Sequence, residues 1–170
     1  MIKKLYKILF LSLFILFNNT SQGDDNLKTD LIVEADNSIE FFEKKKYYVA
    51  SGNAIASKDG ILLKADQIKA FLNHKDNQIN SLFAIGEVYV TNKGISGIAE
   101  EVKYDLIEKK LTFLKGKQSL KTKDITIESK DFLKFDNVNK IANAQGNVKL
   151  TFKNKTKIFS DKLTAFFYKN

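Results

Sequence analysis

One pattern recurs along the chain and limits its possible folds more than any other feature. A glycine opens a segment of alternating apolar and polar residues, a short polar turn follows, and a second alternating segment ends in a small residue beside a polar one. The four glycines, spaced by 34, 30 and 30 residues, are Gly52, Gly86, Gly116 and Gly146. Half units precede the first repeat and follow the last. Self-similarity at this period predicts a repeat architecture in which each unit covers the apolar face of its neighbour.

The segments inside each unit alternate with the period of two that is typical of a half-buried β-strand. In the last unit Val148, Leu150 and Phe152 alternate with lysine and threonine, and short clusters of Asn, Asp, Gly and Lys separate such segments. These clusters are typical of hairpin turns. The chain has no proline and no apolar stripe of helical period. We therefore expect an all-β antiparallel meander of roughly 14 to 16 strands of about 5 to 8 residues each.

Two interruptions of the alternation in each unit predict where the sheet bends. The inward parity slips after Ala65-Asp66 and again after Ala99-Glu100, which is typical of a bulge or corner. The repeated glycine falls on the inward parity, where it permits a second corner. Two corners per unit would produce an open-ended flattened roll, a β-jelly roll built from hairpin repeats of about 30 residues.

The N-terminal segment is typical of an export signal. Lysines precede an apolar run at positions 8–17, and small polar residues follow. This run is about half the roughly 20 apolar residues that a membrane-spanning helix needs. We expect a cleaved signal peptide over residues 1–23, a short linker over 24–31 and one β-jelly-roll domain over 32–170. A cleaved signal peptide predicts localisation in the periplasm. Retention of residues 1–23 as a membrane anchor is the alternative that stays open.

Charge and side-chain chemistry argue against several classes of function. The formal net charge is +8, but every base is a lysine, and the bidentate contacts of nucleic-acid readout favour arginine. The only histidine, His74, lies in a predicted turn, and the chain has no cysteine, so no metal site is expected. Glu100 and Glu101 are adjacent on a strand and face opposite sides. We expect no nucleic-acid partner, no cofactor and no enzymatic activity.

Taken together, three motifs resemble the OstA-like family of lipopolysaccharide-transport proteins. They are strand starts of the type Gly146-Asn147-Val148, corners of the type Ala65-Asp66, and strands of the type Ile-x-Phe or Ile-x-Tyr that follow such corners, all behind an export signal. The resemblance runs from about residue 32 to residue 167. It implies an open-ended roll that binds the acyl chains of lipopolysaccharide. It further implies copies that stack head to tail and join like-folded partners in the inner and outer membranes (LptC-like and LptD-like) into a bridge across the periplasm.

On this reading, the inward apolar residues are candidates for the lipid-binding groove, and the terminal segments are candidates for partner edges. The groove residues would be Ile39, Phe41, Ala56, Leu63, Ile68, Val88, Val90, Val102, Tyr104, Leu120, Ile127, Phe132, Val148, Leu150, Phe152 and Leu163. The edge residues would be Val33, Ala35, Phe166, Phe167 and Tyr168. An inward apolar residue of a small β protein is more often ordinary core than the wall of a ligand site.

Two alternatives stay open at this point. One is a membrane-anchored, LptC-like relative of the same fold in the inner membrane. The other is a structural β-solenoid that polymerises without a ligand and has a filled interior. The third unit also departs from the pattern, because Gln118 and Ser119 replace apolar residues and Lys130 stands where a corner acid is expected.

Overall fold

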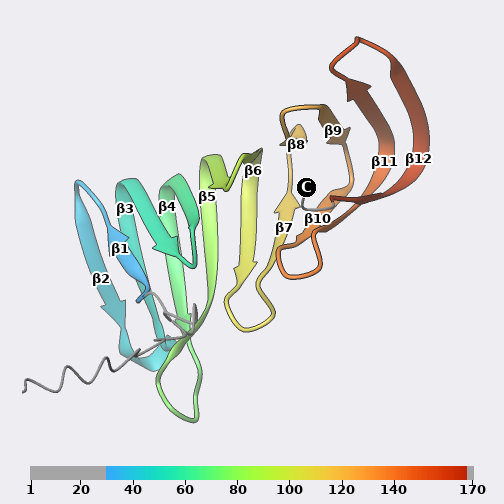
Figure 1. The fold of residues 1–170 in the computed structure, drawn as a ribbon. Coiled ribbons are helices and arrows are strands. Elements are labelled where there is room, and N and C mark those ends of the chain that lie inside the picture. Colours follow the sequence, from blue (N-terminus) through green and yellow to red (C-terminus); the bar gives the residue numbers. More distant parts are fainter. Residues whose placement is uncertain (1–29, 168–170) are drawn as a thin grey trace, which may run out of the picture.

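The computed structural model describes residues 30–167, and within that range most of the chain is β-strand (Figure 1). The predicted signal peptide and Tyr168 lie outside it. The strands are β1 (Ile32–Glu34), β2 (Ser38–Phe42), β3 (Tyr47–Lys58), β4 (Ile61–Leu72), β5 (Ile79–Asn92), β6 (Ile95–Asp105), β7 (Lys110–Leu114), β8 (Gln118–Lys121), β9 (Ile125–Ser129), β10 (Phe132–Asp136), β11 (Ile141–Phe152) and β12 (Lys157–Phe166). One 3-10 turn, η1 (Glu43–Lys45), joins β2 to β3. No helix in the described part is both long and apolar enough to cross a membrane.

All strand pairs are antiparallel and belong to one 12-stranded sheet that a corner divides into two walls. The β2 wall contains β2, β7 and β10, and the β1 wall contains β1, β8 and β9. Strands β3, β4, β5, β6, β11 and β12 run through both walls. The all-β jelly-roll prediction is confirmed. The predicted strand number was too high because the long strands, up to 14 residues in β5, continue through the corner.

Each turn of the roll has one corner where two were predicted. In the β3–β4 pair, Gly52 and Asn53 together lie opposite Asp66, and this β-bulge recurs at Gly86 and Gly146. The glycine and the acidic residue therefore form the same corner from two adjacent strands.

Glycine is required at this corner for two reasons. Gly86 has a φ of +81°, which favours a residue without a Cβ, and an added Cβ would lie 2.8 Å from Cγ of Asp66. The same arrangement places Asn37 over Gly52, Glu100 over Gly116 and Asp131 over Gly146. In the third unit the corner acid is thus Asp131, one residue later than expected. The backbone N–H groups of Lys130 and Asp131 donate to β11 there.

Inward side chains form continuous rows across the whole sheet. One row in the β2 wall connects nine strands through directly paired residues: Ile39, Ala50, Ile68, Ala84, Val102, Phe113, Leu133, Ala144 and Leu163. Large and small side chains mostly alternate along it, so the two walls fit closely against each other. The cavity between them at Gly97 and Phe113 measures only about 10 Å³, so the middle of the roll is a packed core.

Candidate functional site

The predicted groove residues divide into a buried group, a half-buried group and an exposed group. The ten buried ones are Ala56, Leu63, Ile68, Val88, Val90, Val102, Tyr104, Leu120, Ile127 and Val148. Leu150 and Leu163 are half-buried against this core. Ile39 and Phe41 are exposed because they lie on the edge strand β2, and Phe152 is exposed at the end of β11, beside the turn to the edge strand β12.

Phe132 is the one candidate that the structure places on the opposite face. Its neighbour Leu133 pairs with Phe113 and is fully buried, whereas the Phe132 ring lies outside with Lys134 Nζ 5.4 Å from its centroid. The inward assignment was wrong because the corner uses the additional residue Asp131. That residue shifts the parity of β10 by one position.

Both ends of the sheet are open strand edges with exposed apolar side chains. Strands β1 and β2 pair only with β3, and β12 pairs only with β11. Eight of the twelve large hydrophobic side chains that are exposed in residues 30–167 lie at these ends: Ile32, Ile39, Phe41 and Phe42 at the first, and Phe152, Ile158, Phe159 and Phe166 at the second. A sheet edge of this kind is a template for pairing with another chain.

The predicted edge residues lie at these two ends, with different exposure. Val33 and Ala35 are half-buried against the core, and Phe166 is exposed. Phe167 is half-buried and packs edge-on against Phe135, with ring centroids 6.0 Å apart.

Opposite the corner, the hairpin tips of the two walls meet in polar contacts. Asp59 in the β3–β4 turn forms an ion pair with Lys109 in the β6–β7 turn, with Nζ and Oδ2 3.0 Å apart. Further along, the Asn92 side-chain amide donates to Oδ1 of Asn137 in the β10–β11 turn. We call these four residues the seam. Tyr104 is buried in the interior, and burial, followed by the negative charges of Asp59 and Asp105, raises the pKa of its hydroxyl to about 12.

Comparison with known proteins identifies the family. Residues 32–133 match the family model described as LptA/(LptD N-terminal domain) LPS transport protein. The chain belongs to this lipopolysaccharide-transport family. Its fold is similar to the crystal structure of LptH, the LptA-homologous periplasmic component of the lipopolysaccharide transport device of Pseudomonas aeruginosa. The TM-score is 0.62 at 15% identity over 69% of this chain and 82% of that one. No curated protein matches the chain.

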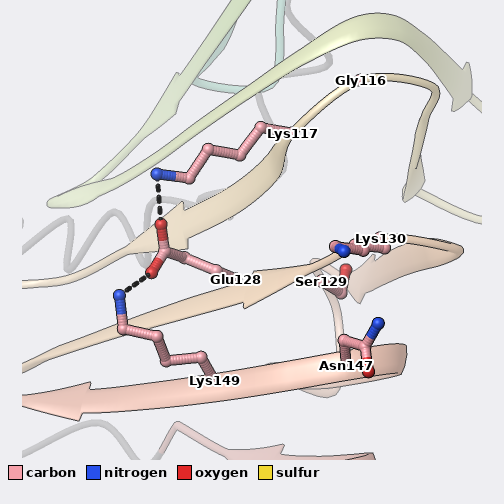
Figure 2. Close-up of a pocket in the computed structure, with 7 residues that line it drawn as sticks. All are labelled: Gly116, Lys117, Glu128, Ser129, Lys130, Asn147 and Lys149. Atoms are coloured by element: carbon pink, nitrogen blue, oxygen red, sulfur yellow. Dashed lines mark hydrogen bonds and ion pairs between the residues drawn. The ribbon is translucent and has the colours of Figure 1, made fainter.

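This member of the LptA/LptD family also has an outer hollow that the sequence did not predict (Figure 2). It measures about 640 Å³ and lies beside the corner, where Lys117 of the loop before β8 and Lys149 of β11 approach Glu128 of β9. Their Nζ atoms lie 2.5 and 2.6 Å from the two carboxylate oxygens. Hydrogen bonds from both lysines hold the pKa of Glu128 below its usual value.

The charged side chains that line the hollow form a structural ion cluster, because Lys117 and Lys149 both form ion pairs with the same carboxylate, that of Glu128. Only the pairing of β9 with β8 and β11 brings these residues together, so alternation along the sequence gives no signal for it. No group of three or more metal-binding side chains occurs within residues 30–167.

Proposed function

We propose that this family member is an LptA-type periplasmic carrier that holds the acyl chains of lipopolysaccharide between its two walls and bridges the inner and outer membranes. The observation that carries the proposal is the continuity of the inward rows. The row that begins at exposed Ile39 ends at half-buried Leu163 after nine paired strands, without a polar interruption. Each methylene of an acyl chain that leaves water for such a surface contributes about 0.8 kcal/mol.

The filled interior supports a second candidate, a structural solenoid that polymerises without lipid. A cavity of about 10 Å³ has no room for an acyl chain unless the walls move apart. The two functions therefore differ in one measurable property, which is whether the buried inward side chains ever contact lipid.

The bridging part of the proposal rests on the two open edges. Strand β12 runs from the β1 wall to the β2 wall, and β1 followed by β2 runs in the same direction. A second copy added head to tail would therefore form a parallel junction and continue the inward rows. Exposed Glu34 and Glu40 at the first edge complement exposed Lys157 and Lys162 at the last. A like-folded domain in either membrane could use the same edges.

Site-specific photo-crosslinking in a lipopolysaccharide-producing bacterium tests the carrier function. A photoreactive amino acid replaces inward Val90 or Leu150, and outward Tyr89 and Lys149 on the same strands are the matched controls. We expect adducts that react with lipopolysaccharide antibody at the inward positions only. A folded, exported protein without such adducts would support the structural solenoid.

Periplasmic localisation and the anchored, LptC-like alternative require a separate measurement. The mature N-terminus, determined by mass spectrometry of protein from a periplasmic extract, should begin near residue 24. Recovery of the full-length chain in the membrane fraction would favour the anchored relative.

A further inference from the structure

The seam is the side of the roll where side chains alone hold the two walls together. At the corner, six strands pass from one wall to the other as continuous backbone. At the seam, the walls are connected by the Asp59–Lys109 ion pair and by the Asn92–Asn137 amide contact. Exposed ion pairs contribute little to stability because water solvates and screens them, and the Lys109 side chain is 43% exposed. The walls can therefore separate at the seam at lower cost than at the corner.

Two buried polar atoms at or beneath the seam have no hydrogen-bond partner among the described residues. They are Oδ1 of Asn92, which is 4% exposed, and the hydroxyl of Tyr104, which is 1% exposed. Burial without a partner costs free energy, and most buried polar groups avoid it. Asn92 borders the same small internal cavity as Val90, Leu111 and Phe135.

The chemistry of these two atoms is complementary to the polar end of an acyl chain. The Asn92 carbonyl oxygen is an acceptor for an amide N–H or a hydroxyl. The Tyr104 hydroxyl, with its raised pKa, stays protonated at neutral pH and can donate to an ester or amide carbonyl. Tyr104 belongs to the buried apolar core, and Asn92 borders the small cavity together with Val90 and Phe135, so the methylenes of the same ligand would lie against apolar side chains.

We propose that the seam is the lateral entrance of the roll and a polar subsite for amide- or ester-linked acyl chains. The hairpin tips separate, the acyl chains enter between the walls, and Asn92 and Tyr104 bind the polar linkage that stays at the seam. This inference rests on the proposed function, because it assumes a ligand whose acyl chains occupy the interior. It adds a route and two residues with defined roles.

Cross-linking the seam tests the lateral entrance. Because the chain has no cysteine, a thiol-reactive linker attaches only to the introduced residues. In the double variant N92C/N137C, a cleavable bis-maleimide joins the tips. The matched control is K64C/Y89C, which carries the same linker between two directly paired strands on the outer face. Binding of fluorescent lipopolysaccharide is measured before linking, after linking and after cleavage.

We expect the seam linker to weaken lipopolysaccharide binding at least 10-fold, cleavage to restore it, and the control linker to change it less than 2-fold. Equal binding by both linked proteins would overturn the lateral entrance while leaving the carrier function intact. A second probe, 1-anilinonaphthalene-8-sulfonate, separates the two hypotheses if the wild-type protein binds no lipopolysaccharide. In that case the carrier function fails. Equal uptake of this dye by both linked proteins then overturns the lateral entrance too. Reduced uptake by the seam-linked protein alone supports the lateral entrance.

The conservative variant Y104F tests the polar subsite. Removal of an unpartnered hydroxyl should leave the melting temperature of the lipid-free protein unchanged or raised, yet weaken lipopolysaccharide binding about 5-fold. Y89F removes a hydroxyl from the exposed outer face and is the control. Unchanged affinity in Y104F would remove Tyr104 from the subsite, and a large loss of stability would show that its hydroxyl has a structural partner.

Discussion

Gly97 lies where the two walls approach each other closely, and its replacement by alanine tests whether the interior is a packed core. Gly97 belongs to β6 in the β1 wall, and an added Cβ would lie 2.5 Å from Cζ of Phe113 and 3.2 Å from the backbone oxygen of Ser119. Phe113 comes from β7 in the β2 wall and is fully buried. The ring cannot move away because other core residues surround it.

The expected cost of Gly97→Ala follows from two opposing effects. Overpacking of a well-filled core typically costs 1–3 kcal/mol. Replacement of a strand glycine by alanine recovers about 0.5–1 kcal/mol of backbone entropy. We therefore expect the free energy of unfolding to fall by about 1–2 kcal/mol. For a domain of this size, that corresponds to a decrease in melting temperature of roughly 3–8 °C.

Urea unfolding of a double-mutant cycle with Phe113→Leu isolates the contact. If the ring causes the cost, the double variant should be more stable than the sum of the single effects predicts, by about 1 kcal/mol. Gly94→Ala is the control for coupling: with a φ of +85° it costs stability through backbone strain, but no heavy atom lies within 4 Å of an added Cβ, so its effect should add to that of Phe113→Leu. Additive effects in the Gly97 cycle would refute close wall packing at this position.

Three further predictions concern polar contacts and the open edges. Gln118→Leu removes the Nε2 hydrogen bonds to the carbonyl oxygens of Lys130 and Asp131, each 3.2 Å, and should cost about 1–3 kcal/mol in urea unfolding. The pKa of Glu128 is lower in the folded state than its unfolded value near 4.5. Its carboxylate therefore stabilises the fold above that pH, and the stabilisation is lost as the pH falls through the lower pKa of the folded state. The melting temperature of Glu128→Gln should accordingly depend less on pH than that of wild type between pH 3 and 6. Ile39→Asp should reduce self-association in sedimentation velocity at least 10-fold, whereas Ile107→Asp, at a more exposed isoleucine in the β6–β7 turn, should not.

The repeat and its period-two alternation were sufficient to predict the fold and most of the inward face. Alternation is a local property, because successive side chains on a strand point to opposite faces whatever the strand pairs with. Val88, Val90, Val148 and Leu150 therefore point inward as expected. The prediction failed at Phe132, where one additional corner residue reverses the parity and the sequence pattern alone gives two equally regular readings.

The single corner could have been recognised from the turn positions. Gly52 and Asp66 are nearly equidistant from the turn at Lys58–Gly60, so folding the hairpin about that turn brings them opposite each other. Treating them as two separate corners counted one bend twice. The seam could not have been predicted in this way, since Asn92 and Asn137 are 45 residues apart. Their contact depends on how far the two walls curve toward each other.

A filled interior and a carrier function are compatible if the roll opens on one side only. An empty apolar channel would forfeit the dispersion contacts of the side chains that line it, so the lipid-free walls close on each other. Along the inward rows alanines such as Ala50 and Ala84 oppose larger residues such as Ile68, which lets the walls meet without polar contacts between them. The walls cannot separate at the corner, because six strands cross it as continuous backbone, whereas at the seam the contacts between the walls include the Asp59–Lys109 ion pair and the Asn92–Asn137 amide contact. The energetic asymmetry between corner and seam thus directs any opening toward the seam, where the unpartnered atoms of Asn92 and Tyr104 lie.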